Sequence, residues 1–277
     1  PEKRDFFLEG ADLFSFGGIP KSPLAFHSRK IGLSSNGSKI AINAGAKLTG
    51  RLGPLGIGVL GMGLDDFENL DSDEVFVGRF TYDLFEESKV GTIFTHGDPQ
   101  SNLNNQLVGV DLNLRSSNWW NEQSVSWHGF YMTSDDENEN SDDVIGTHFT
   151  FPNYPFRASG HWVRTGKNFN PALGFVRRRG GESTGLGFTY YFEQPENELL
   201  EDISVGAEYD RYEWLDGDLD SDELEINLIG IRTLAGDFLG LEVEFERDIL
   251  QEPFEIIDEV IIPSSEYKGV DFELEFR

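Results

Sequence analysis

One stretch decides the fold: Leu107-Val108-Gly109-Val110-Asp111-Leu112-Asn113-Leu114. Every second residue from Val108 to Leu114 is apolar, and the residues between them are mixed or polar. Side chains alternate between the two faces of a β-strand, so this period of two predicts a strand with one apolar face. The same alternation returns at 239–246 and at 270–276. The chain is therefore expected to contain a series of amphipathic strands.

Alternation outside these three segments predicts strands along almost the whole chain. They lie at 38–51, 55–64, 74–86, 89–97, 122–133, 145–151, 156–166, 184–193, 202–214 and 222–234, with a weaker strand near 24–33. The total is about 14 strands, which is what a chain of this length holds at about 20 residues per strand and connection. No helical periodicity extends beyond a turn or two, so we predict an all-β chain.

The length of the strands and the pattern of the connections favour a membrane barrel over a soluble sandwich. Several segments alternate for about 8–12 residues, whereas sandwich strands usually run about 5–6. Short connections at Gly50–Pro54 and Leu234–Asp237 contrast with long acidic ones at Asp65–Glu74, Thr133–Asp143 and Asp216–Glu223. Short turns at one end and long polar loops at the other are typical of outer-membrane barrels. We therefore predict an antiparallel transmembrane β-barrel, with a soluble β protein as the alternative.

Composition excludes several other classes of protein. The chain has 277 residues and a formal net charge of -28, so it should be repelled by nucleic acid. It contains no cysteine, which excludes disulfides and thiolate metal sites. We find no stretch of about 18 apolar residues, which excludes a transmembrane helix. The acidity suits a solvated, cation-rich exterior or a salty habitat, and the barrel prediction implies a lipid bilayer with lipopolysaccharide as surroundings.

The first 23 residues differ from the rest because they do not alternate. They mix phenylalanines with glycines and a proline. We expect residues 1–23 to form a plug or linker that enters or seals the barrel from the periplasmic side, and residues 24–277 to form the barrel itself.

Four motifs resemble a known family. They are Pro1-Glu2-Lys3-Arg4-Asp5-Phe6-Phe7-Leu8-Glu9-Gly10-Ala11-Asp12-Leu13-Phe14, His27-Ser28-Arg29-Lys30-Ile31-Gly32, Gly45-Ala46-Lys47-Leu48-Thr49-Gly50 and Phe169-Asn170-Pro171-Ala172-Leu173-Gly174-Phe175-Val176-Arg177-Arg178. Together they look like uncharacterised bacterial outer-membrane β-barrels that usually follow a domain resembling family-nine carbohydrate-binding modules. His27 and Lys30 depart from the second motif, where an aromatic residue commonly precedes Ser-Arg-Arg-Ile-Gly.

The resemblance implies a bacterial outer-membrane location, but it brings no established activity and no catalytic residues. It also implies that the chain is a piece, with a binding-module-like domain before Pro1 and further strands after Arg277. Phe276 would otherwise be the terminal aromatic residue of a barrel-assembly signal, and Arg277 follows it.

Polar residues on the strands are candidates for the lining of a lumen. If they lie in strands, Arg177 and Arg179 share a face, on which they would bind carboxylates or guide anionic solutes. The alternatives for these arginines are a structural network with acidic residues and a turn at the lipid headgroups. The acidic candidates for the lumen are Glu242, Glu244, Glu246, Glu273 and Glu275.

Two further groups suggest ligands. Asp216, Asp218, Asp220 and Asp222 have the spacing of a Ca²⁺ loop, and Ca²⁺ is the one cofactor that the sequence suggests. The sixth and twelfth positions hold Ser221 and Asn227, where an EF-hand has Gly and Glu, so a solvated loop is the alternative. Aromatic anchors at the membrane interface, or platforms for sugar rings, are expected at Trp119, Trp120, Trp127, Trp162 and Trp214.

We find no G-x-S-x-G motif, no P-loop and no dinucleotide fingerprint, so an enzyme is not expected. The first hypothesis for function is a porin-like outer-membrane channel or anchored scaffold linked to the binding or uptake of saccharides. The second is a structural subunit of a larger cell-envelope complex with a plugged lumen and other envelope proteins as partners. The third is a soluble β-rich protein that binds or hydrolyses polysaccharide.

Overall fold

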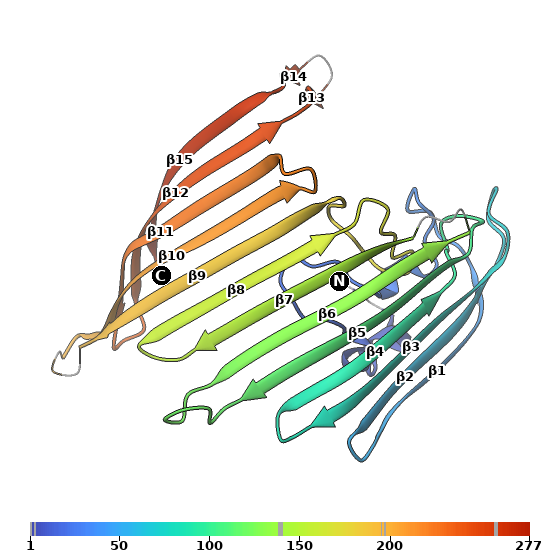
Figure 1. Cartoon of the computed structure of the whole chain (residues 1–277), viewed down its shortest axis with the longest axis horizontal. Helices are drawn as coiled ribbons and strands as arrows, with labels where there is room; N and C mark the ends of the chain where they lie inside the picture. Colours follow the sequence, from blue (N-terminus) through green and yellow to red (C-terminus); the bar gives the residue numbers. More distant parts are fainter. Residues whose placement is uncertain (1, 3, 138–140, 195, 197, 258–259) are drawn as a thin grey trace. The chain divides into compact units, whose positions relative to one another are not determined.

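The computed structural model confirms an all-β chain, with 63% of residues in strands and 4% in helices. It describes residues 2, 4–137, 141–194, 196, 198–257 and 260–277. Thirteen strands form one antiparallel sheet in the order β1-β2-β3-β4-β5-β6-β7-β8-β9-β10-β11-β12-β15, and β13 and β14 form a separate hairpin (Figure 1). Among the described residues no pairing joins β1 to β15. A large antiparallel sheet is therefore established, and its closure into a barrel is not.

The elements follow one another along the chain, and the connection between β8 and β9 spans 166–180. The helical turns are α1 (Asp5–Leu8), η1 (Ala11–Phe14) and η2 (Ser28–Lys30). The strands are β1 (Ile42–Leu52), β2 (Leu55–Leu64), β3 (Asp73–Leu84), β4 (Ser88–His96), β5 (Asn105–Ser116), β6 (Val125–Asp136), β7 (Asp142–Pro152), β8 (Phe156–Thr165), β9 (Gly181–Glu193), β10 (Leu200–Trp214), β11 (Leu219–Thr233), β12 (Phe238–Leu250), β13 (Phe254–Ile257), β14 (Val260–Ile262) and β15 (Ser265–Phe276).

The chain divides into two compact units. Unit 1 comprises Pro1–Ser117, Ser126–Thr147 and Val163–Gly180, and unit 2 comprises Asn118–Val125, His148–Trp162 and Gly181–Arg277. Within each unit, strands that follow one another in the sequence pair as hairpins, and this pairing fixes the strand order and the register.

In unit 1 both faces of the sheet carry apolar side chains, and one of these faces is exposed. The register of β3, β4 and β5 places Arg79, Ile93 and Gly109 in one row, and their neighbours point to the other face. Val108 and Val110 are 53% and 44% exposed, whereas Leu107, on the opposite face, is fully buried. A water-soluble sheet that buries one face usually presents a polar face to water, so an exposed apolar face beside an apolar core is unusual.

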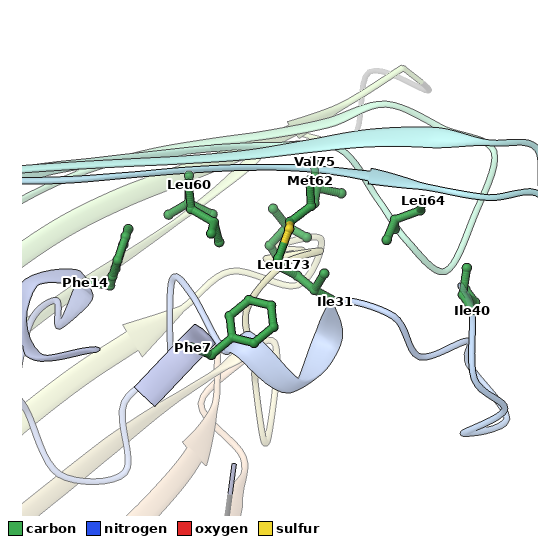
Figure 2. Packing of buried hydrophobic residues seen from close by; sticks show 10 residues of the cluster. Phe7, Phe14, Ile31, Ile40, Leu60, Met62, Leu64, Val75 and Leu173 are labelled. Atoms are coloured by element: carbon green, nitrogen blue, oxygen red, sulfur yellow. The ribbon is translucent and has the colours of Figure 1, made fainter. Parts of the chain in front are cut away.

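The buried face of unit 1 is covered by two segments that lie outside the strands. Phe7, Phe14, Ile31 and Ile40 from the N-terminal segment and Leu173 from the β8–β9 connection pack on the sheet (Figure 2). Their partners in the sheet are Leu60, Met62, Leu64, Val75 and Val77. A second cluster joins Ile19, Ala25 and Phe169 to Ile93, Leu107, Phe130, Met132, Val144 and Val163. Unit 1 therefore has a dry core between the sheet and residues 7–40.

This packing corrects one prediction. The strand expected near 24–33 is wrong: these residues contain η2 and form only isolated bridges, from Leu24 to Phe175 and from Leu33 to Lys39. Gly32 has a φ of +80°, in the left-handed region, which ends any extended conformation there. The alternation of apolar residues in this segment reflects packing on the sheet rather than membership of it. Phe7, Phe14 and Ile19 from this segment do contact the sheet, and the role of residues 1–23 as the seal of a barrel stays a prediction.

Unit 2 repeats the exposed apolar face without a dry core on the other side. Register places Leu239, Leu241, Val243 and Phe245 opposite Phe276, Leu274, Phe272 and Val270. On β15, Phe272, Leu274 and Phe276 are 74%, 71% and 78% exposed. The opposite face carries acidic side chains, and these form the candidate site.

Candidate functional site

The polar face of unit 2 is an ordered array of carboxylates. Alternation in β10, β11, β12 and β15 sends acidic residues to this face, and between the register shifts the pairing aligns them directly across the strands. One row contains Glu208, Glu225, Glu244 and Asp271. The neighbouring rows contain Asp210, Glu223 and Glu246, and then Asn227, Glu242 and Glu273.

Like charges directly opposite each other destabilise a sheet unless water or cations screen them. The array therefore requires a hydrated face and attracts cations. Glu242, Glu244, Glu246 and Glu273 share this face, as their alternation predicts, and whether it lines a lumen stays a prediction. Glu275 also lies here, and its neighbour Arg277 forms an ion pair with it.

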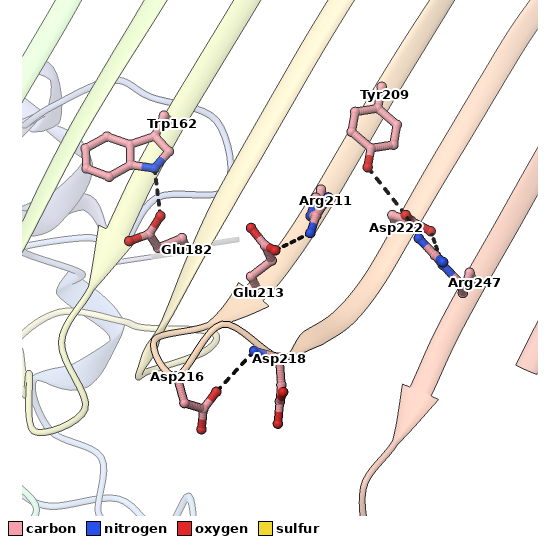
Figure 3. A network of polar contacts seen from close by, with 9 residues as sticks. All are labelled: Trp162, Glu182, Tyr209, Arg211, Glu213, Asp216, Asp218, Asp222 and Arg247. Carbon is pink, nitrogen blue, oxygen red and sulfur yellow. Dashed lines mark hydrogen bonds and ion pairs between the residues drawn. The ribbon is translucent and has the colours of Figure 1, made fainter. Parts of the chain in front are cut away.

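The apolar face of unit 2 ends in a band of polar contacts at one end of its strands (Figure 3). The Tyr209 hydroxyl donates to Asp222 at 3.4 Å, and the Arg247 Nε donates to the same carboxylate at 2.9 Å. Arg211 pairs with Glu213, and Lys268 with Glu266. On these strands apolar side chains fill the middle of the face, and charged pairs lie near the ends of the strands.

The four aspartates predicted to hold Ca²⁺ do not form one site. Only Asp216 and Asp218 lie in the β10–β11 connection, where the Asp218 amide donates to Asp216 at 3.3 Å. Asp220 and Asp222 lie in β11, and Asp222 is engaged by Arg247. Within the described part of the chain no group of three or more His, Asp or Glu side chains is placed to hold a metal ion. The pattern was misleading because the strand begins earlier than expected, so Asp220 and Asp222 belong to β11 and not to the loop. The acidic run 135–143 is a weaker candidate, and residues 138–140 at its centre lie outside the described residues.

The arginine cluster lies outside the strands. Arg177 and Arg179 are exposed in the connection between β8 and β9, and the Arg179 Nη2 donates to Asn170 Oδ1 at 2.9 Å. A ladder on a strand face is therefore not formed, and whether these arginines face a lumen stays a prediction. Phe169 and Leu173 pack on the sheet in the core of unit 1, so this segment covers the sheet and does not join it as a strand.

The tryptophans occupy three kinds of position. Trp119 and Trp120 are 61% and 68% exposed in the β5–β6 connection. Trp127 is on the exposed face of β6, and the Trp162 indole donates to Glu182 at 3.1 Å. Trp214 shares the polar face with Asp210, because it lies four residues along β10. The expected place of Trp214 in an interfacial girdle does not fit this position, whereas the other tryptophans remain candidates.

One polar cluster in unit 1 was not anticipated. Arg79 is 1% exposed, and its guanidinium pairs in a bidentate manner with Asp111, at 2.7 and 2.8 Å. Its Nε donates to the Ser15 carbonyl at 2.9 Å, and the Gly17 amide donates to Asp111 at 3.1 Å. We call these four residues the latch, because they fix the N-terminal segment to β3 and β5. The sequence signal for this cluster was Arg79 itself, a lone arginine on the face of β3 that also carries Val75 and Val77.

None of the helices in the described residues is long or apolar enough to cross a membrane. No protein-family model matches the chain, and no curated protein matches it either.

Proposed function

We propose that the chain is part of a bacterial outer-membrane β-barrel, and that the polar face of unit 2 borders a hydrated path that favours cations. One observation carries the proposal: the apolar face of the sheet is exposed on strand after strand, in both units. Monomeric soluble proteins rarely expose contiguous apolar patches of more than a few hundred Å². In a bilayer such a face is solvated by lipid, and the alternate polar residues face water.

The charge of the polar face supports the preference for cations. Rings of Asp and Glu select cations in channels. The rows of Glu208, Glu225, Glu244 and Asp271 provide negative charge across four neighbouring strands. The polar pairs at the ends of the same strands suit the level of the lipid headgroups. Lipid and lipopolysaccharide are thus the proposed partners of the apolar face.

A second candidate is a structural envelope subunit with an occluded lumen, which other envelope proteins would join. The dry core under residues 7–40 favours it, since the latch and the buried apolar clusters hold that segment on the sheet. The link to saccharide uptake rests on the family resemblance alone, and a fold does not determine a function.

The test is purification with and without detergent, followed by gel electrophoresis of boiled and unboiled protein. We expect solubility only in detergent and a band that shifts on boiling. Planar-bilayer recordings in a KCl gradient then separate the two candidates: a cation-selective conductance supports the channel, and its absence in folded protein supports the structural subunit. Monodisperse protein without detergent and without a shift would refute both, and would favour the soluble polysaccharide-binding protein or hydrolase.

A further inference from the structure

An open pocket of about 290 Å³ lies on the polar face of unit 2. Its polar lining consists mainly of Arg157, Ser159, Thr189, Glu208, Glu225 and Asn227. The pocket exists because two glycines stand where side chains would fill it: Gly187 is paired with Glu208, and Gly206 with Asn227. Small-molecule sites begin at about this size.

The cationic side of the pocket is pre-oriented. Arg157 Nη1 donates to the Tyr191 hydroxyl at 3.1 Å, and its guanidinium lies 4.9 Å from the centre of that ring. Tyr191 in turn stacks on Tyr154 at 5.5 Å. The other N–H groups of Arg157 have no hydrogen-bond partner among the residues that the structure describes. A guanidinium with free donors in a fixed orientation suits a carboxylate.

The anionic side of the pocket also has unused capacity. Glu208 and Glu225 are directly opposite each other on β10 and β11, and no cation in the described ranges forms an ion pair with either. Beside them the Asn227 Oδ1 is buried and accepts no hydrogen bond from any described residue. An ammonium group, which has three donors and no acceptor, would satisfy these oxygens together.

We propose that this pocket binds a small zwitterionic solute of amino-acid or dipeptide size. Its carboxylate pairs with Arg157, and its ammonium group lies among Glu208, Glu225 and Asn227. The separation of charge across the pocket distinguishes this ligand from others: Arg157 disfavours a metal ion, the two glutamates disfavour a simple anion, and a neutral sugar uses neither charge. The proposal goes beyond the proposed function and holds whether or not the sheet encloses a conducting path.

The experiment is calorimetric titration of folded, detergent-solubilised protein with the dipeptide Ala-Lys. We expect saturable binding, and none with N-acetyl-Ala-Ala amide, which carries neither charge, or with maltose. Arg157→Gln should weaken the binding of Ala-Lys at least about tenfold, because it removes a hydrogen-bonded charge. The same variant should leave the binding of C-amidated Ala-Lys unchanged, since that probe lacks the carboxylate. Glu225→Gln should weaken the binding of both probes.

Two variants guard against a trivial loss of fold. Gly187→Leu fills the pocket, and a Cβ there meets only the Ser159 Oγ, at 2.9 Å, so we expect a normal gel shift with no binding. Arg51→Gln, an exposed arginine of unit 1, should bind as the parent chain does. Equal binding of maltose, unchanged binding by Gly187→Leu, or no binding by correctly folded parent protein would each overturn the proposal. None of these outcomes bears on conductance, so failure here is distinguishable from failure of the proposed function.

Discussion

The two units use the same amphipathic strands and treat their second faces in opposite ways. In unit 1 the face opposite the exposed apolar one is dry, covered by residues 7–40, and closed around the ion pair of Arg79 and Asp111. In unit 2 that face is an array of carboxylates that needs water. The comparison teaches that alternation fixes only which side chains share a face. Whether the second face becomes core or wet surface depends on segments distant in the sequence.

The largest test of the comparison removes the latch. Arg79→Ala leaves Asp111 charged and buried, so we expect the free energy of unfolding to fall by about 3–5 kcal/mol. Urea unfolding in detergent micelles measures it, and limited proteolysis should show earlier cleavage within residues 1–41. The control is Arg51→Ala, whose pair with Asp83 is exposed and should contribute about 0–1 kcal/mol. Equal effects of the two substitutions would show that residues 1–41 are not held by the latch.

The next test asks whether the exposed apolar face meets lipid. Phe272→Arg places a charge on that face, and Glu273→Arg places one on the opposite face of the same strand. For protein folded in lipid vesicles we expect a loss of about 2–4 kcal/mol for the first substitution and much less for the second. If both variants have the same midpoint of urea unfolding as the parent protein, the apolar face is not in contact with lipid.

A smaller effect is expected from the charge of the array. We expect the joint replacement of Glu242, Glu244 and Glu246 by Gln to lower the potassium-to-chloride permeability ratio severalfold in planar-bilayer recordings. The reason is that the face loses fixed negative charge. Glu252→Gln, in the exposed connection after β12, is the matched control and should leave the ratio unchanged. An unaltered ratio in the triple variant would remove the acidic face from the path of ions.

The smallest expected effect concerns His27 in the segment that covers unit 1. Burial lowers the pKa of His27 below its ordinary 6.5, with Arg29 adding to the effect. The unfolded chain then binds a proton more readily than the folded one, so stability falls as pH drops below about 6.5. Hydrogen exchange of residues 24–31 should be faster at pH 5.5 than at pH 7.5, after correction for intrinsic rates. The His27→Gln variant should lose this dependence; if it keeps it, another group is responsible.

Most strands could be predicted from the sequence because each carries its own period of two. The sequence also contained a sign of the contrast between the units. Strand β2 has no polar residue on either face; its sequence is Leu55-Gly56-Ile57-Gly58-Val59-Leu60-Gly61-Met62-Gly63-Leu64. Such a strand is buried on one face and apolar on the other. The covering segment was harder to predict because its contacts are irregular and distant. The pocket was not predictable, since Gly187, Arg157 and Asn227 come together only through the register of four strands.

One contact has a consequence for the order of folding. The backbone bridge between Leu24 and Phe175 joins positions on opposite sides of eight strands in the sequence. Neighbouring hairpins close short loops and form early, whereas contacts of high sequence separation cost more loop-closure entropy and form late. The N-terminal segment is synthesised before the strands, but it can reach its final place only after β8 has formed. Refolding should therefore show strand formation first, followed by a slower phase in which protection of residues 7–40 appears.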